Sequence, residues 1–318
     1  NTPNADFTSE TSRQRMQAGL AQVRAELGRE YPLMIGDQPV TTGQWFESHN
    51  PARPKEVVGR IAQANDEMVN RAVTAAAAAQ RAWRLVPAAD RAEHVTRIGQ
   101  QLEARRFELA ALMAIECGKT WREADADVSE AIDYCTYYAR EMVRIAEHPR
   151  RRDIEGETNE YFYAPRGVVA VISPWNFPLA LLANMTAAAV VTGNAVVMKP
   201  ASAAATVAAR FMEACTAAGL PAGVVNYLPG PGVTVGEALV RHPGVAIVAF
   251  TGSRAVGCRI NQLASAAPTA RPGLKRVIAE MGGKNAAIVD ANADLDEAIK
   301  GIIASAFSYA GQKCSAAS

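Results

Sequence analysis

An uncharged stretch of 32 residues constrains the fold of this chain more than any other feature. It runs from Gly167 to Met198, between Arg166 and Lys199. By length alone it could span a lipid bilayer. Polar and helix-breaking residues interrupt it, however, at Pro174, Asn176, Pro178, Asn184, Gly193 and Asn194. We therefore predict a buried strand, a turn, an apolar helix and a second strand, with no membrane span.

The same alternation of apolar runs and helical patterns continues along the rest of the chain. After a strand at 167–173, further apolar runs predict strands at 195–199, 224–228, 245–250, 275–280 and 286–290. Helical patterns between them cover 179–191, 202–219, 235–242, a segment that begins near Ser253, and 295–308. Continuous apolar strands separated by helices indicate a parallel sheet covered on both faces. With right-handed crossovers, this is a doubly wound α/β fold.

The first 150 residues have a different pattern, which we interpret as mostly helical. Long helices are predicted over 66–85, 88–117 and 121–146, the first with acidic residues in its opening turn and an alanine-rich body. A short alternating, aromatic-rich strand is predicted over 160–165. The predicted fold class is therefore α/β, with a doubly wound parallel sheet that follows a set of N-terminal helices.

Composition excludes several classes of protein. The 33 Lys and Arg residues nearly balance the 32 Asp and Glu residues, which argues against a nucleic-acid partner bound through a bulk basic field. The five cysteines form no C-x-x-C pair and the four histidines no H-E-x-x-H pair, so no metal site is expected. Free thiols, and first residues that are polar rather than the apolar core of a signal peptide, favour the cytoplasm.

Polar residues that follow the strands are the candidate site, because doubly wound sheets bind ligands at the carboxyl ends of their strands. After the first strand, the prolines of S-P-W-N-F-P hold Asn176 on a stiff loop, where its amide can donate to a developing oxyanion. A plain turn asparagine explains this motif alone equally well. Lys199 ends the second strand, where it either binds sugar hydroxyls or is simply a charge at a strand end.

Two glycine-containing loops are candidates for binding a dinucleotide. The segment from Gly230 to Gly236 is close to the G-x-G-x-x-G fingerprint, but it is one residue too long and is weak evidence alone. Gly252 and Ser253 open a helix after the fourth strand, and bare amides at a helix N-terminus suit a pyrophosphate.

Two residues near the end of the chain could carry covalent chemistry. Glu280 ends the fifth strand beside two glycines, as a general base for water would, although a strand-end surface carboxylate is the default interpretation. Cys314 follows a helix in a glycine-containing turn next to Lys313, and a neighbouring cation lowers the pKa of a thiol. A single cysteine is more often an inert buried thiol. The other four cysteines lie in predicted helices, and we interpret them in this way.

Together these segments resemble the aldehyde dehydrogenase superfamily. The resemblance rests on S-P-W-N-F-P, the K-P pair, P-G-x-G-x-x-x-G, F-T-G-S-x-x-x-G, E-M-G-G-K-N and G-Q-K-C-S, in this order from about Ile35 to the last residue. It implies that Cys314 is the nucleophile, that Asn176 stabilises the oxyanion and that Glu280 activates water. It further implies NAD contacts at Ser173, Pro174, Trp175, Lys199, Ser202, Gly232, Gly236, Phe250, Thr251, Gly252, Ser253 and Gly282. Substrate contacts are implied at Phe177, Lys313 and Ser315.

A finer resemblance is to the subfamily that oxidises L-glutamate γ-semialdehyde, formed from pyrroline-5-carboxylate, to glutamate in proline catabolism. It is carried by E-C-G-K-T-W-R-E-A-D-A-D-V-S-E-A-I-D-Y and by the final S-A-F-S-Y-A-G-Q-K-C-S-A-A-S. In some bacteria this module is fused to a proline dehydrogenase, which is therefore a possible partner. Two alternatives stay open from the sequence: another aldehyde dehydrogenase, such as a CoA-acylating one, and a nucleotide-binding fragment without turnover.

The cofactor prediction depends on one departure from the family pattern. Many family members have Glu three residues after the Lys of the K-P pair, where it binds the ribose hydroxyls, and Ser202 occupies that position here. A neutral residue removes the repulsion toward a 2′-phosphate. We therefore expect NAD as the main cofactor, with some tolerance of NADP.

The resemblance also divides the chain into domains. Residues 1–279 correspond to the NAD-binding domain with its N-terminal helical region, in which 149–165 resembles part of an oligomerisation arm. A homo-oligomer is therefore expected. Residues 280–318 correspond to the beginning of a second, catalytic α/β domain. Since only four residues follow Cys314, we expect further polypeptide to belong to the native enzyme.

Overall fold

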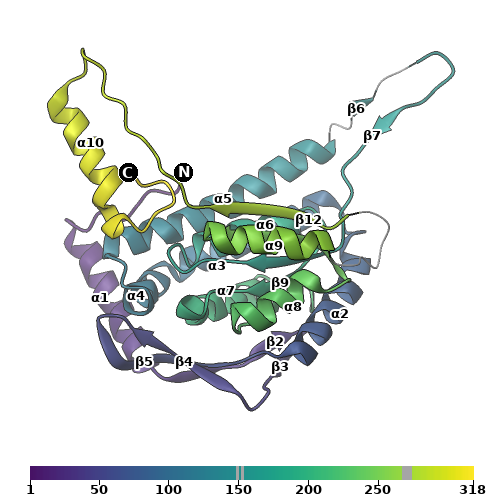
Figure 1. The fold of residues 1–318 in the computed structure, drawn as a ribbon, viewed down its shortest axis with the longest axis horizontal. Helices are drawn as coiled ribbons and strands as arrows, with labels where there is room; N and C mark the ends of the chain where they lie inside the picture. Colours follow the sequence, from purple (N-terminus) through teal and green to yellow (C-terminus); the bar gives the residue numbers. More distant parts are fainter. Residues whose placement is uncertain (148–149, 152–153, 267–273) are drawn as a thin grey trace.

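A seven-stranded sheet forms the centre of the computed structural model, which describes residues 1–147, 150–151, 154–266 and 274–318 (Figure 1). The five strands from β12 to β10 run parallel, and β2 and β3 add an antiparallel edge. The parallel α/β sheet predicted from the sequence is confirmed. Its order is β12 (Arg276–Met281), β11 (Val245–Gly252), β8 (Val168–Ile172), β9 (Ala195–Lys199), β10 (Val225–Tyr227), β2 (Leu33–Ile35) and β3 (Gln38–Val40).

Helices cover both faces of the sheet because alternate strand residues point to opposite sides. In β8, Val169 and Val171 belong to one apolar cluster, whereas Val168, Ala170 and Ile172 belong to another. The first cluster contains residues of α3 (Ala88–Ala104), α4 (Arg106–Glu116), α5 (Trp121–Glu147), α6 (Ala180–Val191) and α7 (Ala205–Ala217). The second contains residues of α2 (Asp66–Trp83), α8 (Glu237–Arg241) and α9 (Arg254–Ala266).

The expectation that the first 150 residues are mostly helical is wrong for residues 29–62, which contain five strands. Besides β2 and β3, these are β1 (Arg29–Tyr31), β4 (Trp45–Asn50) and β5 (Arg53–Ala62), which form a separate sheet in the order β1-β5-β4. The strands β1, β2 and β3 are three residues long. Pro32 and Gly36, which has a φ of 68°, separate them. Strands this short show no readable alternation of apolar and polar residues.

The single helix predicted over 88–117 is also wrong, because the chain bends at Arg105 and forms α3 and α4. Arg105 has φ −104° and ψ 15°, outside the helical region. Its guanidinium binds Glu108 and Glu213, whereas the next side chain, Arg106, binds Asp125 in α5. The bend lets α4 pack on α1 (Glu10–Ala25) while α3 packs on α5.

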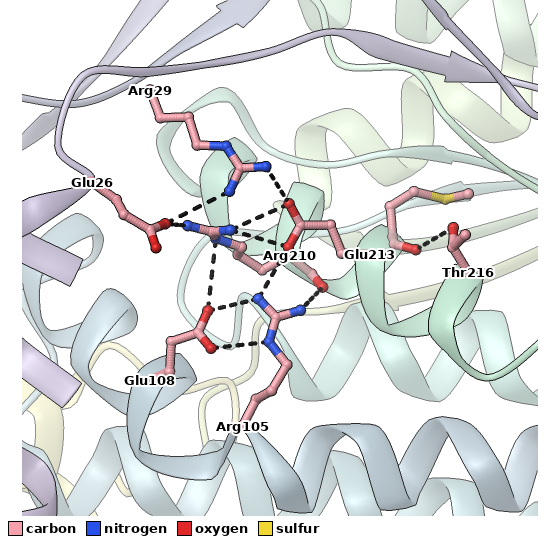
Figure 2. Close-up of polar contacts among 8 residues, drawn as sticks. Glu26, Arg29, Arg105, Glu108, Arg210, Glu213 and Thr216 are labelled. Atoms are coloured by element: carbon pink, nitrogen blue, oxygen red, sulfur yellow. Dashed lines mark hydrogen bonds and ion pairs between the residues drawn. The ribbon is translucent and has the colours of Figure 1, made fainter. Parts of the chain in front are cut away.

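A cluster of arginine and glutamate side chains connects the end of α1, β1, α4 and α7 (Figure 2). Arg210 of α7 lies at its centre, hydrogen-bonded to Glu26 and, at 3.1 Å, to Glu213. Glu213 also accepts from Arg29 at 2.9 Å and from Arg105 at 3.1 Å. Burial alone would raise the pKa of Glu213, but Arg210 and its neighbours lower it below the ordinary value. The cluster therefore holds the N-terminal segment against the helical layer.

The strand predicted over 286–290 is wrong. These residues are exposed, and only the adjacent Asn285 makes a bridge, to Ala317. A strand needs a hydrogen-bonded neighbour, and the described part of the chain places none beside this segment. The following helix, α10 (Leu295–Phe307), stands apart from the sheet and buries no residue (Figure 1). The Asp294 side chain caps it by accepting from the amides of Asp296 and Glu297.

A narrow arm projects from the end of α5 (Figure 1). It contains β6 (Arg150–Arg151) and β7 (Glu160–Tyr161), which pair in antiparallel fashion, so the strand predicted over 160–165 is shorter than expected. Of the predicted arm 149–165, residues 149 and 152–153 lie outside the described residues. Tyr161 at the end of β7, and Phe162 and Tyr163 just after it, are exposed. No helix in the described residues has the length and apolarity to cross a membrane.

Replacing Arg106 by Met should strongly destabilise the fold. The Arg106 guanidinium forms two hydrogen bonds, of 2.7 and 2.8 Å, with Asp125, whose carboxylate also accepts from the amide of Ala5. The variant leaves a buried carboxylate without its cation, so the free energy of unfolding should fall by about 3–5 kcal/mol. Urea denaturation measures this loss.

The matched control is Arg13→Met, which removes an exposed ion pair with Glu10. It should leave the free energy of unfolding almost unchanged, because an exposed ion pair contributes little to stability. Equal losses in the two variants would mean that the Arg106–Asp125 pair does not anchor the N-terminal segment.

Candidate active site

Two hollows open at the carboxyl edge of the sheet, where the strand order reverses. From β8 the chain proceeds to β9 and β10 on one side and later returns to β11 on the other, which creates a crevice between β8 and β11. One cleft of about 390 Å³ is lined by the residues that follow β8, the ends of β11 and β12, and the segment that contains Cys314. A second hollow of about 270 Å³ lies between the end of β9, the one-turn helix η2 (Gly232–Gly236) and α9.

The structure brings many of the predicted site residues into these two hollows. The first cleft is lined by Pro174, Trp175, Asn176, Thr251, Gly252, Ser253, Gly282, Lys313 and Cys314. The second is lined by Lys199, Gly232 and Gly236. The first set comes from four separate segments of the chain, which only the sheet brings together.

Cys314 is one of two exposed thiols in the chain. It follows η3 (Ser308–Gly311), in which Tyr309 and Ala310 have φ values of 52° and 54°, in the left-handed region that non-glycine residues rarely adopt. The side-chain amide of Asn285 then donates to the carbonyl of Cys314 at 2.7 Å. The thiol is therefore displayed from a fixed turn. Cys135 and Cys215, by contrast, are buried, and burial raises the pKa of each.

Asn176 points toward the cysteine segment. Its Nδ2 donates to the carbonyl of Gln312 at 2.9 Å, two residues before Cys314. One of its two amide hydrogens is thus engaged, and the other is available to a ligand in the cleft. The loop that contains Asn176 and the segment that contains Cys314 are therefore in direct contact at the cleft.

The Lys313 ammonium is paired with a carboxylate of α5. It forms an ion pair with Glu123 at 2.8 Å, and both side chains are about four-fifths buried. The cation next to Cys314 therefore has a carboxylate partner of its own, and this pair fixes the segment on the N-terminal end of α5.

Besides Ser202, which is described below, five predicted residues line neither hollow. Glu280 is exposed on β12, in register with Thr251, and the residues that follow it line the cleft instead. Ser173 and Phe250 are buried beneath the edge. Phe177 is half-buried under the Asn176 loop, and Ser315 is exposed just beyond Cys314.

The second hollow surrounds a buried lysine. Lys199 is 6% exposed, and its Nζ donates to the carbonyl of Pro200 at 3.1 Å. Burial lowers the pKa of Lys199 to about 8. Ser202 begins the one-turn helix η1 (Ser202–Ala204), where it is exposed, and it does not line this hollow.

The N-terminus of α9 separates the two hollows. Ser253 precedes the helix and its hydroxyl accepts from the amide of Val256 at 3.4 Å. Gly252 is required here, because a Cβ at this position would lie 2.6 Å from the ring of Phe250. The chain can thus turn tightly from β11 into α9, with its first amides facing the crevice.

Sequence reasoning missed the residues that support the site from below. These are Lys119, Glu123, Asp127, Asn285 and Tyr309, whose contacts join segments far apart in the chain. No local signal marked Lys119 or Asp127, because the helix start between them already contains the charged residues Arg122, Glu123 and Asp125. The described residues contain no group of three or more His, Cys, Asp or Glu side chains that could hold a metal ion.

The comparisons with known proteins agree with this geometry. The chain is 50% identical over 316 residues to a 1-pyrroline-5-carboxylate dehydrogenase of Geobacillus thermodenitrificans, a match that covers 99% of this chain and 61% of the relative. It also superposes on a Thermus 1-pyrroline-5-carboxylate dehydrogenase crystallised with bound NAD (TM-score 0.97, 43% identity), over 100% of this chain and 62% of that one. Proline utilization A from Bdellovibrio bacteriovorus matches with a TM-score of 0.96 and 44% identity, over 100% of this chain and 33% of that one.

The chain spans about three fifths of the length of the curated relatives it matches. Its residues 39–318 match the Aldehyde dehydrogenase family. That range contains both hollows and every residue that lines them, so the motifs, the fold and the family agree. The chain belongs to the aldehyde dehydrogenase family.

Proposed function

We propose that this chain serves the NAD-dependent oxidation of L-glutamate γ-semialdehyde to glutamate, the second step of proline catabolism. The observation that carries the proposal is the cleft in which an exposed Cys314 faces Asn176 and the N-terminus of α9. The relatives named 1-pyrroline-5-carboxylate dehydrogenase support the choice of substrate. Because pyrroline-5-carboxylate is the product of proline oxidation, a proline dehydrogenase is the proposed functional partner that supplies the substrate, supported by the similarity to proline utilization A.

Cys314 carries the covalent chemistry in this proposal. Its thiolate attacks the aldehyde carbon, a C–S bond forms, and the carbonyl electron pair moves to oxygen. The free amide hydrogen of Asn176 and the backbone N–H of Cys314 donate to that oxyanion. Loss of a hydride from the same carbon to a bound NAD, as the oxyanion's electron pair re-forms the C=O bond, would leave a thioester on Cys314. Glu280 then takes a proton from the water that hydrolyses this thioester and releases the Cys314 thiolate, which requires the Glu280 side chain to rotate from the exposed side of β12 into the cleft.

The residues of the two hollows fit a dinucleotide. The amides that open α9 face the crevice, where they suit a pyrophosphate, and Gly232 has open space around its Cα. Lys199 and Ser202 are the proposed contacts of the adenine ribose. When bound, NAD accepts the hydride from the substrate carbon. Phe177, Lys313 and Ser315 are the proposed substrate contacts, with Ser315 near the substrate carboxylate.

The assembly and location are part of the proposal. The exposed aromatic residues of the arm, Tyr161, Phe162 and Tyr163, favour a homo-oligomer in which the arm packs on a second copy. All five cysteines are free thiols, which supports a reducing compartment such as the cytoplasm.

Replacing Cys314 by Ser should abolish NADH formation, because a serine hydroxyl is a far weaker nucleophile than a thiolate at neutral pH. The assay uses glutamate semialdehyde with this chain and with any longer polypeptide that contains it. Cys258→Ser is the matched control, since it removes the other exposed thiol. NADH formation that persists in the Cys314 variant, or that requires CoA, would contradict the proposal.

Replacing Ser202 by Glu should select against NADP. A carboxylate at this position repels a 2′-phosphate and accepts from ribose hydroxyls, so KM for NADP should rise at least about tenfold while KM for NAD stays within about twofold. Steady-state kinetics with both cofactors measure the change. Equal KM shifts for the two cofactors would show that Ser202 does not face the 2′ position.

Replacing Lys199 by Met should stabilise the fold while weakening NAD binding. Because burial lowers the pKa of Lys199 from 10.5 to about 8, the folded state carries a desolvation cost that is complete below pH 8 and is relieved as the pH rises toward 10.5. The variant should therefore gain up to about 3 kcal/mol at pH 7 and little near pH 10.5. Urea denaturation at both pH values and calorimetric titration with NAD test the two halves of this prediction. A loss of stability at pH 7 would contradict it.

A further inference from the structure

We propose that Lys119 is a positioning residue that holds the Asn176 loop and the Cys314 segment in register with each other. The inference rests on the proposed function for its catalytic meaning, but the geometry stands by itself. Lys119 does not line the cleft; it lies beneath the two segments that do, and it contacts both.

The Lys119 side chain is fully buried at the junction of three parts of the chain. It follows Gly118, whose φ of 67° turns the chain sharply between α4 and α5. Its Nζ donates to Asp127 Oδ2 at 2.8 Å and to the backbone carbonyl of Asn176 at 2.9 Å. The side chains of Lys119 and Asp127 are both 0% exposed. The ammonium thus joins α5 to the loop after β8.

The same ammonium lies between two aromatic rings. Its Nζ is 4.2 Å from the ring centre of Phe177 and 4.6 Å from that of Tyr309. A desolvated cation over an aromatic face is attracted by the ring quadrupole. Phe177 belongs to the Asn176 loop and Tyr309 to the turn before Cys314, so one buried charge contacts both segments.

Asp127 fixes the other end of the same loop. Its second oxygen, Oδ1, accepts from the backbone amide of Ala180 at 2.6 Å, at the first turn of α6. Burial raises the pKa of Asp127, against the lowering effect of Lys119. The pair therefore binds the loop at Asn176 and at Ala180, four residues apart, which determines how the loop leaves β8 and enters α6.

These contacts close a ring around the site. Tyr309 donates its hydroxyl hydrogen to the carbonyl of Cys117, next to Lys119 in the linker, at 3.1 Å. Across the mouth of the cleft, Asn176 donates to Gln312. The Asn176 loop and the Cys314 segment are thus connected twice: directly by the Asn176–Gln312 hydrogen bond, and through Lys119 beneath the cleft. If the connection through Lys119 is lost, we expect the Asn176–Gln312 hydrogen bond alone to hold the two segments less firmly.

The energetics favour a geometric role over a stabilising one. A buried ion pair repays its desolvation cost poorly, and apolar residues of similar volume often stabilise a fold as well or better. The pair instead supplies a donor to the carbonyl of Asn176 and an acceptor for the amide of Ala180, and so fixes the positions of these two backbone groups. A displacement of about 1 Å at a reacting centre can cost a hundredfold in rate.

The test uses the double variant Lys119→Met with Asp127→Asn, which removes both charges and keeps similar volumes. The single Lys119→Met variant leaves a buried carboxylate unpaired and could fail to fold. The matched control is Lys275→Met, which removes another buried lysine, bound to the carbonyls of Val240 and His242 away from the cleft. Amide hydrogen exchange is measured over residues 173–180 and 309–316, together with kcat and KM.

In the double variant we expect amide exchange in both segments to accelerate at least about tenfold, with the sheet strands unchanged. We expect kcat to fall by about ten- to a hundredfold. KM for NAD should change far less, because none of the Lys119 contacts among the described residues reaches the second hollow, where the adenosine half of NAD would bind. Unchanged exchange in both segments, or the same acceleration in Lys275→Met, would overturn the inference.

The two proposals fail separately. If the parent chain and longer polypeptides that contain it form no NADH with any semialdehyde, the proposed function fails, and hydrogen exchange still decides the role of Lys119. If the parent protein is active and the double variant keeps both its kcat and its exchange protection, the positioning role fails and the proposed function stands.

Discussion

Burial on both faces of the central strands is the constraint on which the rest of the structure depends. Every residue of β8 and β9 is buried, because helices cover the sheet on both sides. A polar side chain inside such a strand would lose its hydration without gaining a partner. Apart from Lys199 at the last position of β9, β8 and β9 contain no polar side chain, and the polar groups of the site appear where strands end, at Asn176 after β8, at Lys199 closing β9 and at Ser253 after β11. The site is a consequence of how the core is made.

The loops at this edge of the sheet are held in place by side chains of the helical layer. The N-terminal part of α5 supplies Glu123 to the Lys313 ammonium and Asp127 to the amide that begins α6. The linker before it supplies Lys119. The helix that covers the sheet therefore also positions the residues that line the cleft, from the side opposite to the one a ligand would enter.

The parts of the fold that could be predicted are those whose signal is local. Apolar runs of five or more residues gave β8, β9 and β11, and the motif at each strand end placed Asn176, Ser253 and Cys314 in one cleft. The three-residue strands β1 to β3 are too short to show a pattern. The bend at Arg105 has no local signal either, because it depends on contacts of Arg105 with Glu213 and of Arg106 with Asp125 in other helices. Lys119 was invisible for the same reason: its partners lie 8, 57 and about 190 residues away.

Three buried lysines show how partners distinguish a structural cation from one that awaits a ligand. Lys119 has a carboxylate, a carbonyl and two rings, so its charge is compensated within the fold. Lys275 has two carbonyls, at 2.5 and 2.9 Å, that end α8. Lys199 has one carbonyl, at 3.1 Å, and borders a hollow. Burial lowers the pKa of both Lys275 and Lys199 to about 8, so the lowered pKa does not separate them. The difference is that Lys199 has N–H donors without a protein partner and also borders a hollow that a ligand could fill. Among the three lysines, only Lys199 combines these two properties. That asymmetry, rather than titration, is the physical reason to assign Lys199 to a ligand and Lys119 to the frame that holds the cleft.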